Sequence, residues 1–339
     1  MTCILGFVFS ILATLLPSLL AIAILWWLDR YEKEPLWLLS IIFFWGAIPT
    51  VIMALIAQII LDIPVSYLLG KSILYSLTNL SIVAPLTEET FKALIILIIF
   101  VVYRQEFDSV MDGILYGALV GFGFSVVEDV MYLMGSLWNG GWGSWGMTAA
   151  LRVGLYNLNH AMFTACTGVG FGLARNSKEW WKKLLFPMSG WLLAMLLHGI
   201  HNGGTVFAEQ TCLLSCLGAT LVDWIGVLTI LVLVVVSVKR EQSWFEELGP
   251  EISAGIITAD EYQIASNYKV RFARGWAVFT RHGPIAWFKW SKFVQLIVDL
   301  AYKKHQKKVA GEGERTEKLI ATLRQRIAQA RPRLPGSEA

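Results

Sequence analysis

The sequence predicts an all-α membrane protein: a polytopic bundle of about seven transmembrane helices, with the N-terminus outside and a helical cytoplasmic tail. Of the 339 residues, 56% are apolar and only 16% are charged, which is unlike soluble domains. The apolar residues gather in runs of about 20 or more, the length that an α-helix needs to cross a hydrocarbon core of about 30 Å. After residue 238 the runs stop, and the chain becomes polar.

Seven apolar runs are long enough to span a bilayer, and they predict the membrane helices in order. We expect them at residues 3–28, 35–61, 79–103, 110–134, 149–174, 184–208 and 211–238. The segment 62–78 is shorter and broken, so the sequence leaves an eighth span open. The first run is too long for a cleavable signal peptide and has no basic segment before it, so we expect it to remain as an anchor. Residues 1–238 are therefore the predicted membrane domain, and 239–339 are a basic, helix-rich tail.

The distribution of lysine and arginine predicts the orientation of these helices. Three loops on one side carry Arg30, Lys33, Arg104, Arg175, Lys178, Lys182 and Lys183. The loops on the other side carry only Lys71 and, at the start of the fifth run, Arg152. The tail holds 18 Lys and Arg against 11 Asp and Glu. Because positive loops stay in the cytoplasm, the tail is predicted to be cytoplasmic and the N-terminus external.

Several ionisable side chains lie inside the apolar runs, where each charge near the bilayer centre costs roughly 2.5–3.5 kcal/mol. They are Glu88, Glu89, Lys92, Glu128, His160 and His198, from the third to the sixth run. At 1.5 Å per residue, Glu88 lies about 14 Å, Glu128 about 9 Å, His160 about 17 Å and His198 about 15 Å below the outer ends of their spans. Four helices therefore bring polar side chains to one layer. We expect them to face a polar cavity enclosed by the bundle.

The spacing of these residues suggests several kinds of chemistry. Lys92 follows Glu88 by four residues and Glu89 by three, so it can neutralise one of them on the same helix face. A glutamate that is buried in an apolar layer and lies next to a lysine can act as a general base. His198 and Asn202, also four residues apart, could donate hydrogen bonds to an oxyanion. Oxygen and nitrogen ligands from separate helices could instead hold a divalent metal with a bound water, an arrangement that suits zinc.

These motifs together resemble those of the PrsW family of intramembrane proteases, which is related to the CAAX-protease and bacteriocin-processing superfamily. The matching stretches are "DRYEKEP" at 29–35, "EETFK" at 88–92, "DGILYGALVGFGFSVVE" at 112–128, His160 with the glycines at 168, 170 and 172, and "HGIHN" at 198–202. The resemblance covers about residues 29–205 and does not include the tail. It departs from the family pattern at Asp129, where asparagine is expected after the glutamate of the second motif.

The resemblance implies an intramembrane endopeptidase, of glutamic or metallo type, acting on membrane-anchored protein substrates. By similarity, Glu88 or Glu89 would activate water, and His198 with Asn202 would stabilise the oxyanion. Glu128 and His160 would complete a water or metal site, so a divalent ion such as zinc would have Glu128, His160 and His198 as ligands. The family resemblance also implies a multi-pass protein of the bacterial cytoplasmic membrane.

Two other functions fit parts of the same pattern. A proton-coupled transporter would also place carboxylates and histidines at mid-membrane as a relay. Such carriers usually contain internal repeats and paired broken helices. We find no repeat between the two halves, and the bend expected at Pro85 has no partner in the second half. A catalytically silent relative that binds membrane helices is a third interpretation, against which the complete Glu and His set argues.

Outside this layer, the sequence makes three more predictions. Gly113, Gly117 and Gly121 form a small-residue stripe that lets helices approach closely. Asp223 lies about 18 Å deep in the last span, near the level of Lys92, so the two are expected to pair, directly or through water. The tail run 284–309 either lies on the anionic inner leaflet or forms a helical hairpin with 313–331. Its apolar side chains at helical spacing are Trp287, Trp290, Phe293, Ile297 and Leu300. No motif predicts nucleic-acid binding.

Overall fold

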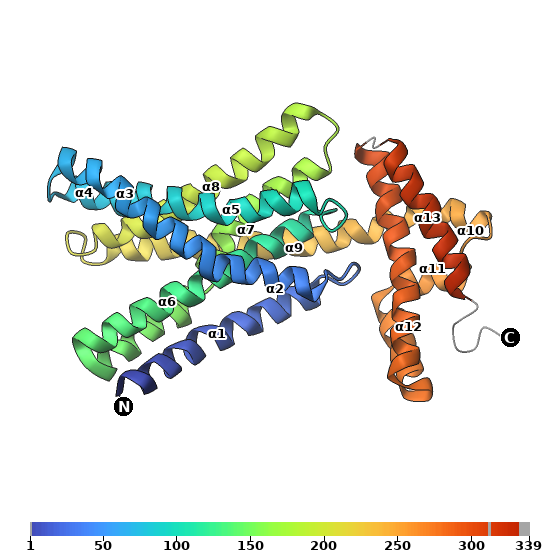
Figure 1. Ribbon diagram of the computed structural model, residues 1–339, viewed down its shortest axis with the longest axis horizontal. Coiled ribbons are helices and arrows are strands. Elements are labelled where there is room, and N and C mark those ends of the chain that lie inside the picture. The colour runs from blue at the N-terminus through green and yellow to red at the C-terminus, as the bar shows by residue number, and fades with distance from the viewer. Residues whose placement is uncertain (1, 311–312, 332–339) are drawn as a thin grey trace. The chain divides into compact units, whose positions relative to one another are not determined.

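The structure, a computed structural model, describes residues 2–310 and 313–331, and every regular element in this part of the chain is a helix (Figure 1). The all-α prediction is confirmed. The N-terminal part contains α1 (Thr2–Leu28), α2 (Leu36–Trp45), α3 (Val51–Leu69), α4 (Ile73–Thr78) and α5 (Ala84–Val102). Next come α6 (Val110–Ala149), α7 (Asn159–Arg175), α8 (Trp180–Val206) and α9 (Leu214–Trp244). Short π-helical segments join some of them: η1 (Gly46–Thr50), η2 (Asn79–Val83) and η3 (Ala150–Leu155).

Five helical segments of the described chain are long and apolar enough to cross a membrane, so a polytopic helical bundle is confirmed but the predicted count of seven is not. They are Cys3–Leu28, Leu36–Leu69, Val110–Arg175, Trp180–Val206 and Leu214–Ser253. The difference arises in two places. Val110–Arg175 counts as one segment of 66 residues although it contains α6, η3 and α7, with a non-helical Gly141 inside α6, and we expected two spans there. Helix α5 has only 19 residues and carries three charged side chains, Glu88, Glu89 and Lys92. It is therefore too polar to count among the apolar candidate spans.

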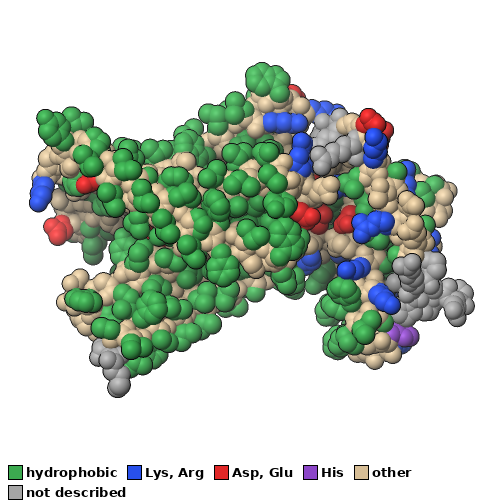
Figure 2. Space-filling model, viewed as in Figure 1, with side chains coloured by type: hydrophobic (Ala, Val, Ile, Leu, Met, Phe, Trp, Pro, Cys, Tyr) green, Lys and Arg blue, Asp and Glu red, His purple; other side chains and the backbone are tan. Residues whose placement is uncertain are grey.

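The chain divides into two compact units, each with its own core. The first, called the membrane unit, consists of Met1–Trp27, Glu34–Arg175 and Trp180–Val234. Hydrophobic side chains cover most of the face of this unit seen in Figure 2, as expected of a surface in contact with lipid. The second, called the tail unit, consists of Val235–Ala339 together with the short loops Leu28–Lys33 and Asn176–Glu179.

Local sequence determines where the two central helices of the site begin. Helix α6 starts with a capping box, in which the Ser109 hydroxyl accepts from the Asp112 backbone N–H and the Asp112 carboxylate accepts from the Ser109 N–H. In α5, Pro85 occupies the first turn, where a helix does not need its missing N–H. The bend expected at Pro85 takes the form of the π-helical η2 that leads directly into α5.

Helix α6 packs along α7, and α7 packs along α8, to form the centre of the membrane unit. The predicted glycine stripe makes the first contact possible. A Cβ at Gly113, Gly117 or Gly121 would overlap backbone atoms of Gly168, Thr164 or His160 in α7. The prediction of close helix approach is therefore confirmed, and the stripe determines where α7 places His160.

Replacing Gly117 by alanine should destabilise the protein by about 1–3 kcal/mol, because the new methyl group would force α6 and α7 apart. Gly135→Ala is the matched control, since that glycine lies on the same helix with open space around it. Thermal unfolding of the purified variants in detergent measures the difference. Equal melting temperatures for the two variants would contradict close packing at Gly117.

The tail unit has an apolar core built from five helical elements: η4 (Phe245–Leu248), α10 (Gly249–Ser253), α11 (Ala259–Ser266), α12 (Tyr268–Ala310) and α13 (Glu314–Ala330). Phe293, Ile297 and Leu300 of α12 lie in this core with Leu323 and Ile327 of α13. The hairpin that we considered for 284–309 and 313–331 is therefore present.

A buried ion cluster supports this core. Arg324 and Lys304 both donate to Glu251. Burial raises the pKa of Glu251, but these hydrogen bonds and charges outweigh it and lower the pKa below its usual value.

Candidate active site

Helix α5 places its three charged side chains on one buried face. Glu88 is 6% exposed, and Glu89 and Lys92 are fully buried. The Lys92 ammonium lies 2.8 Å from Glu89 Oε1 and 3.5 Å from Glu88 Oε2. The spacing of three and four residues therefore produces the predicted pairing within one helix.

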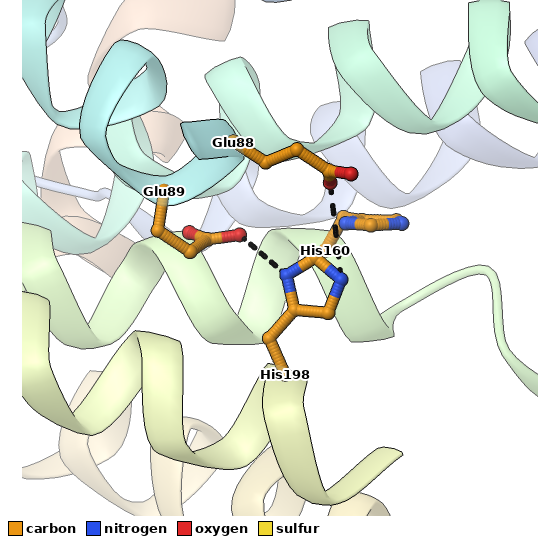
Figure 3. Close-up of side chains that lie close together, drawn as sticks. All are labelled: Glu88, Glu89, His160 and His198. Carbon is orange, nitrogen blue, oxygen red and sulfur yellow. Dashed lines mark hydrogen bonds and ion pairs between the residues drawn. The ribbon is translucent and has the colours of Figure 1, made fainter. Parts of the chain in front are cut away.

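Three helices bring their polar side chains together around this face. Glu88 and Glu89 of α5, His160 of α7 and His198 of α8 each offer one ligand atom, and these atoms all lie within 4.8 Å of one another. Figure 3 shows the two carboxylates and the His160 ring next to the imidazole of His198. The four residues, called here the Glu/His cluster, were all predicted from the sequence as site residues.

Glu89 uses its hydrogen-bonding capacity on protein partners. Its Oε1 accepts from Lys92 Nζ at 2.8 Å and contacts His198 Nδ1 at 3.0 Å. Its Oε2 accepts from the Thr164 hydroxyl at 3.0 Å. With three partners and no exposed surface, Glu89 is positioned to hold its neighbours in place.

Glu88 is held much less completely than Glu89. Its Oε1 accepts from Gln58 Nε2 at 3.2 Å. Its buried Oε2 makes no hydrogen bond within the described part of the chain, although His198 Nε2 lies 3.8 Å away. Because a buried carboxylate oxygen normally has a hydrogen-bond partner, this atom is oriented for a water, a substrate or an ion.

His160 bridges the cluster to Glu128. Its Nε2 lies 2.8 Å from Glu128 Oε2, and its Nδ1 lies 3.0 Å from Lys92 Nζ. Since the ammonium can only donate, Nδ1 presents a lone pair to it, and Nε2–H donates to Glu128. These contacts require the neutral tautomer with its proton on Nε2. The unprotonated Nδ1 then faces the Glu/His cluster. Lys92 also lies 3.9 Å from the centre of the Phe124 ring, a cation–π contact.

Glu128 is anchored by an arginine that sequence reasoning did not assign to the site. Arg152 Nη2 donates to Glu128 at 2.6 Å, and its Nε donates to Asp129 at 2.5 Å. Asp129, the departure from the family pattern, also accepts from the Ser125 hydroxyl at 3.0 Å. The sequence did contain a sign of this role. Arg152 lies at the start of the fifth apolar run, which has no other Lys, Arg, Asp or Glu before Arg175.

Asn202 is engaged outside the Glu/His cluster. Its amide donates to the Leu80 carbonyl oxygen at 2.9 Å, which joins α8 to η2. The structure therefore brings five of the six predicted catalytic residues into one connected group, with Glu128 attached through His160. It gives Asn202 a different hydrogen bond.

Within the described part of the chain, Asp223 does not pair directly with Lys92 and has other partners. Asp223 Oδ2 accepts from Asn159 Nδ2 at 2.9 Å and contacts His201 Nδ1 at 2.7 Å. This second polar group joins α7, α8 and α9 next to the cluster, because Asn159 precedes His160 and His201 follows His198 by three residues. The Phe163 ring stacks on His198, with ring centres 4.9 Å apart, and its centre lies 6.2 Å from that of His201.

The donor atoms of the Glu/His cluster fit a divalent metal. Two carboxylates and two imidazoles are the oxygen and nitrogen ligands that zinc takes in proteins. Glu88 Oε2, which makes no hydrogen bond within the described residues, is an anionic oxygen beside these ligands. Glu128 on the far nitrogen of His160 is the outer carboxylate that often fixes a metal-binding histidine.

Comparison with known proteins places the membrane unit in a family. Residues 34–238 match the family described as "PrsW family intramembrane metalloprotease". "Protease PrsW" of Geobacillus kaustophilus is 27% identical over 179 residues, which cover 51% of this chain and 69% of the relative. "Protease PrsW" of Oceanobacillus iheyensis is 29% identical over 196 residues, covering 56% and 80%. That of Bacillus subtilis is 27% identical over 191 residues, covering 56% and 79%.

No solved structure matches this chain. The match to the family nevertheless spans all the residues of the Glu/His cluster, with Glu128, Arg152 and Asp223. The matching relatives come from bacteria. The chain is therefore a bacterial integral membrane protein and a protease that belongs to the PrsW family.

Proposed function

We propose that this protein hydrolyses peptide bonds of membrane-anchored protein substrates, and that Glu88 is the residue that activates the attacking water. The observation that carries the proposal is the difference between the two adjacent glutamates. Glu89 makes three hydrogen bonds, whereas Glu88 has a buried oxygen without one. A general base needs a free lone pair aimed at the reacting water.

In this proposal, Glu88 accepts a proton from water as the water oxygen attacks the carbonyl carbon of the scissile bond. Glu88 then returns that proton to the leaving amine nitrogen as the carbon–nitrogen bond breaks. His198, held by Glu89 through Nδ1, presents Nε2 on the side of Glu88. In the form without a bound ion, a protonated His198 would donate to the oxyanion, and Glu89 would stabilise the imidazolium. The nearby Lys92 ammonium adds positive charge where the oxyanion develops.

The predicted partner of His198 in this step, Asn202, has its amide on Leu80. A role at the oxyanion would require that hydrogen bond to break on substrate binding. We therefore assign the oxyanion to His198 and Lys92, and we give Asn202 the role of joining α8 to η2.

The charge of the site supports a metallo-type rather than a purely glutamic enzyme. The carboxyl groups of Glu88, Glu89, Glu128 and Asp129 face only two permanent cations, Lys92 and Arg152. Buried charges need compensation, so two negative charges would be left when all four carboxyl groups are ionised. One divalent ion would balance them. We propose that Glu88, Glu89, His160 and His198 would surround it, with the imidazoles of His160 and His198 as ligands, Glu88 kept as the base and Glu128 orienting His160. When bound, such an ion would polarise the carbonyl and lower the pKa of a water.

This assignment predicts about one divalent ion per chain in the purified protein, as in other single-site metalloenzymes. His160→Ala/His198→Ala should lose it, whereas Asn202→Ala should keep it because its amide lies on Leu80. Elemental mass spectrometry of protein purified without chelator measures the content. Equal and negligible metal in wild type and the double variant would favour the glutamic type.

Proteolysis itself is tested with the purified full chain in liposomes that also contain a bacterial membrane-protein extract. The wild type should create new peptide termini in or next to apolar segments, and His198→Ala should create none. A proton-coupled transporter fits the same ionisable layer but receives no support from the family match. Proton flux without any new terminus would favour it and would contradict the proposed function.

A further inference from the structure

Exposed apolar side chains of the tail unit are concentrated in one place. In the described part of residues 239–339, every exposed large apolar side chain lies between 272 and 288: Phe272, Trp276, Phe279, Ile285, Trp287 and Phe288. Their exposed fractions range from 41% for Phe279 to 74% for Ile285. Contiguous exposed apolar surface of this kind marks a site of interaction with protein or membrane.

These residues form the tip of a helical hairpin. Gly283 has φ 82° and ψ 177°, so α12 reverses there and consists of two arms, 268–282 and 284–310. A positive φ is accessible to glycine without strain, and Pro284 directly after it starts the second arm. Figure 2 shows hydrophobic side chains gathered at this end of α12, with basic side chains beside them.

The two arms hold their aromatic rings in place. Gly275 of the first arm packs directly against Trp287 and Trp290 of the second. The Phe279 and Trp287 rings meet edge to face with centres 6.3 Å apart. Between the arms lies an apolar groove of about 360 Å³ lined by Tyr268, Phe272, Trp276, Phe279, Trp287 and Trp290. The exposed surface is therefore a preformed feature.

Folding of the tail unit does not account for this surface. The core of the unit begins one turn later on the second arm, at Phe293, which is 3% exposed. The exposed aromatic rings therefore project from a unit whose core is already complete.

The segment that forms the hairpin tip carries basic side chains and no acidic ones. Between residues 268 and 292 the chain has no Asp or Glu and six basic side chains: Lys269, Arg271, Arg274, Arg281, Lys289 and Lys292. Arg274 pairs with Asp260 at 3.4 Å on the exposed surface, and Arg281, Lys289 and Lys292 are exposed. Aromatic residues next to lysine and arginine fit the boundary of an anionic lipid layer, where rings enter the headgroup region and cations meet phosphate.

Chain connectivity keeps the hairpin close to a membrane. Arg271 donates to the Tyr31 carbonyl oxygen at 3.1 Å, within the tail unit. Tyr31 follows Leu28, the last residue of a candidate membrane span, by three residues. Three extended residues reach at most about 10 Å, so the base of the hairpin stays near the membrane surface, and the first arm extends about 18 Å from there to Gly283. The predicted topology makes that surface the cytoplasmic one, which is the anionic leaflet.

From these observations we propose that the tip of the α12 hairpin, residues 272–292, docks on the anionic inner surface of the lipid bilayer. The aromatic and aliphatic side chains insert about 5–10 Å, to the boundary between headgroups and acyl chains, and the basic side chains bind lipid phosphates. The family match ends at residue 238, so this surface belongs to the part of the chain that the family does not explain.

The test measures the depth of a spin label at the tip in the full-length protein. Ile285→Cys is made in a chain whose four cysteines, Cys3, Cys166, Cys212 and Cys216, are replaced by serine or alanine. The labelled protein is placed in liposomes of phosphatidylcholine with phosphatidylglycerol. Lys318→Cys, at an exposed position of α13, is the matched control.

We expect the spin label at 285 to collide often with oxygen and rarely with a water-soluble nickel complex. The label at 318 should collide often with the nickel complex and less often with oxygen. Adding Arg281→Gln, Lys289→Gln and Lys292→Gln, or replacing phosphatidylglycerol by phosphatidylcholine, should restore the nickel collisions at 285. Phe288→Cys gives the same reading if the first variant folds poorly.

Nickel collisions at 285 as frequent as those at 318 in anionic liposomes would overturn the proposal. A second copy of the chain could also cover the tip. Protection that disappears when each nanodisc of the same lipid holds a single copy would identify that copy as the cover and would likewise overturn it.

Discussion

Glu88→Gln should abolish peptide hydrolysis while leaving the protein folded. The amide keeps the size of the side chain and can still receive the Gln58 hydrogen bond, but it cannot take a proton from water. Loss of a general base typically lowers a rate by about 10²–10⁴-fold. Quantified product formation by equal amounts of purified protein in liposomes measures the loss.

Glu209→Gln is the matched control for this variant. It makes the same change of charge at an exposed position of the membrane unit and should cleave at the wild-type rate. The melting temperature of Glu88→Gln should stay close to that of the wild type, since Lys92 keeps Glu89 as its closer ion-pair partner. Retention of more than about a tenth of the wild-type rate would rule out Glu88 as the general base, on the magnitude expected for that role.

Lys92→Met should destabilise the protein strongly, because it leaves Glu88 and Glu89 buried without their shared cation. Removing one partner of a buried ion pair costs about 3–5 kcal/mol. The Lys92→Met/Glu89→Gln double variant removes both charges and should recover much of that loss. The double variant should remain inactive, since the neutral glutamine at position 89 cannot hold His198 as the Glu89 carboxylate does.

Thermal unfolding and the level of protein in the membrane measure the double-mutant cycle. Lys183→Met, at an exposed position, is the control and should change stability little. If the double variant is no more stable than Lys92→Met, the Glu89 carboxylate does not need the Lys92 charge for its burial. The ion pair proposed to anchor Glu89 would then be wrong.

The sequence predicted which residues would lie together because charges are conspicuous inside apolar runs. Helix geometry then converts a residue number into a depth. Glu88, His160 and His198, each in a different helix, were expected at similar depths, and the structure brings them together. The same reasoning failed for Asp223, because depth gives no information on which way a helix is rotated. The Asp223 side chain contacts Asn159 and His201 instead.

Two other features depended on contacts that sequence spacing does not encode. Asn202 lies one turn after His198, yet its amide faces the Leu80 carbonyl of another segment. Arg152 lies in η3, where the chain turns between α6 and α7, and that turn returns its side chain to Glu128. Neither the π-helical turn nor its direction could be inferred from the residues before the structure was known.

The two units differed in how much the sequence could predict. The close approach of α6 to α7 followed from a regular spacing of glycines, which has one simple structural meaning in membranes. For the tail, the amphipathic pattern of 284–309 fitted both a protein core and a membrane surface. The structure divides the run at about Phe293: the later residues are buried, and the earlier aromatic residues are exposed.

The most direct test of the central claim is to map new protein termini by mass spectrometry in membranes of cells that express wild type or Glu88→Gln at equal levels. The account predicts termini in or beside membrane spans of other proteins that appear with the wild type and are absent with Glu88→Gln. The same termini in both samples, or none in either across several growth and stress conditions, would contradict an intramembrane protease that uses Glu88.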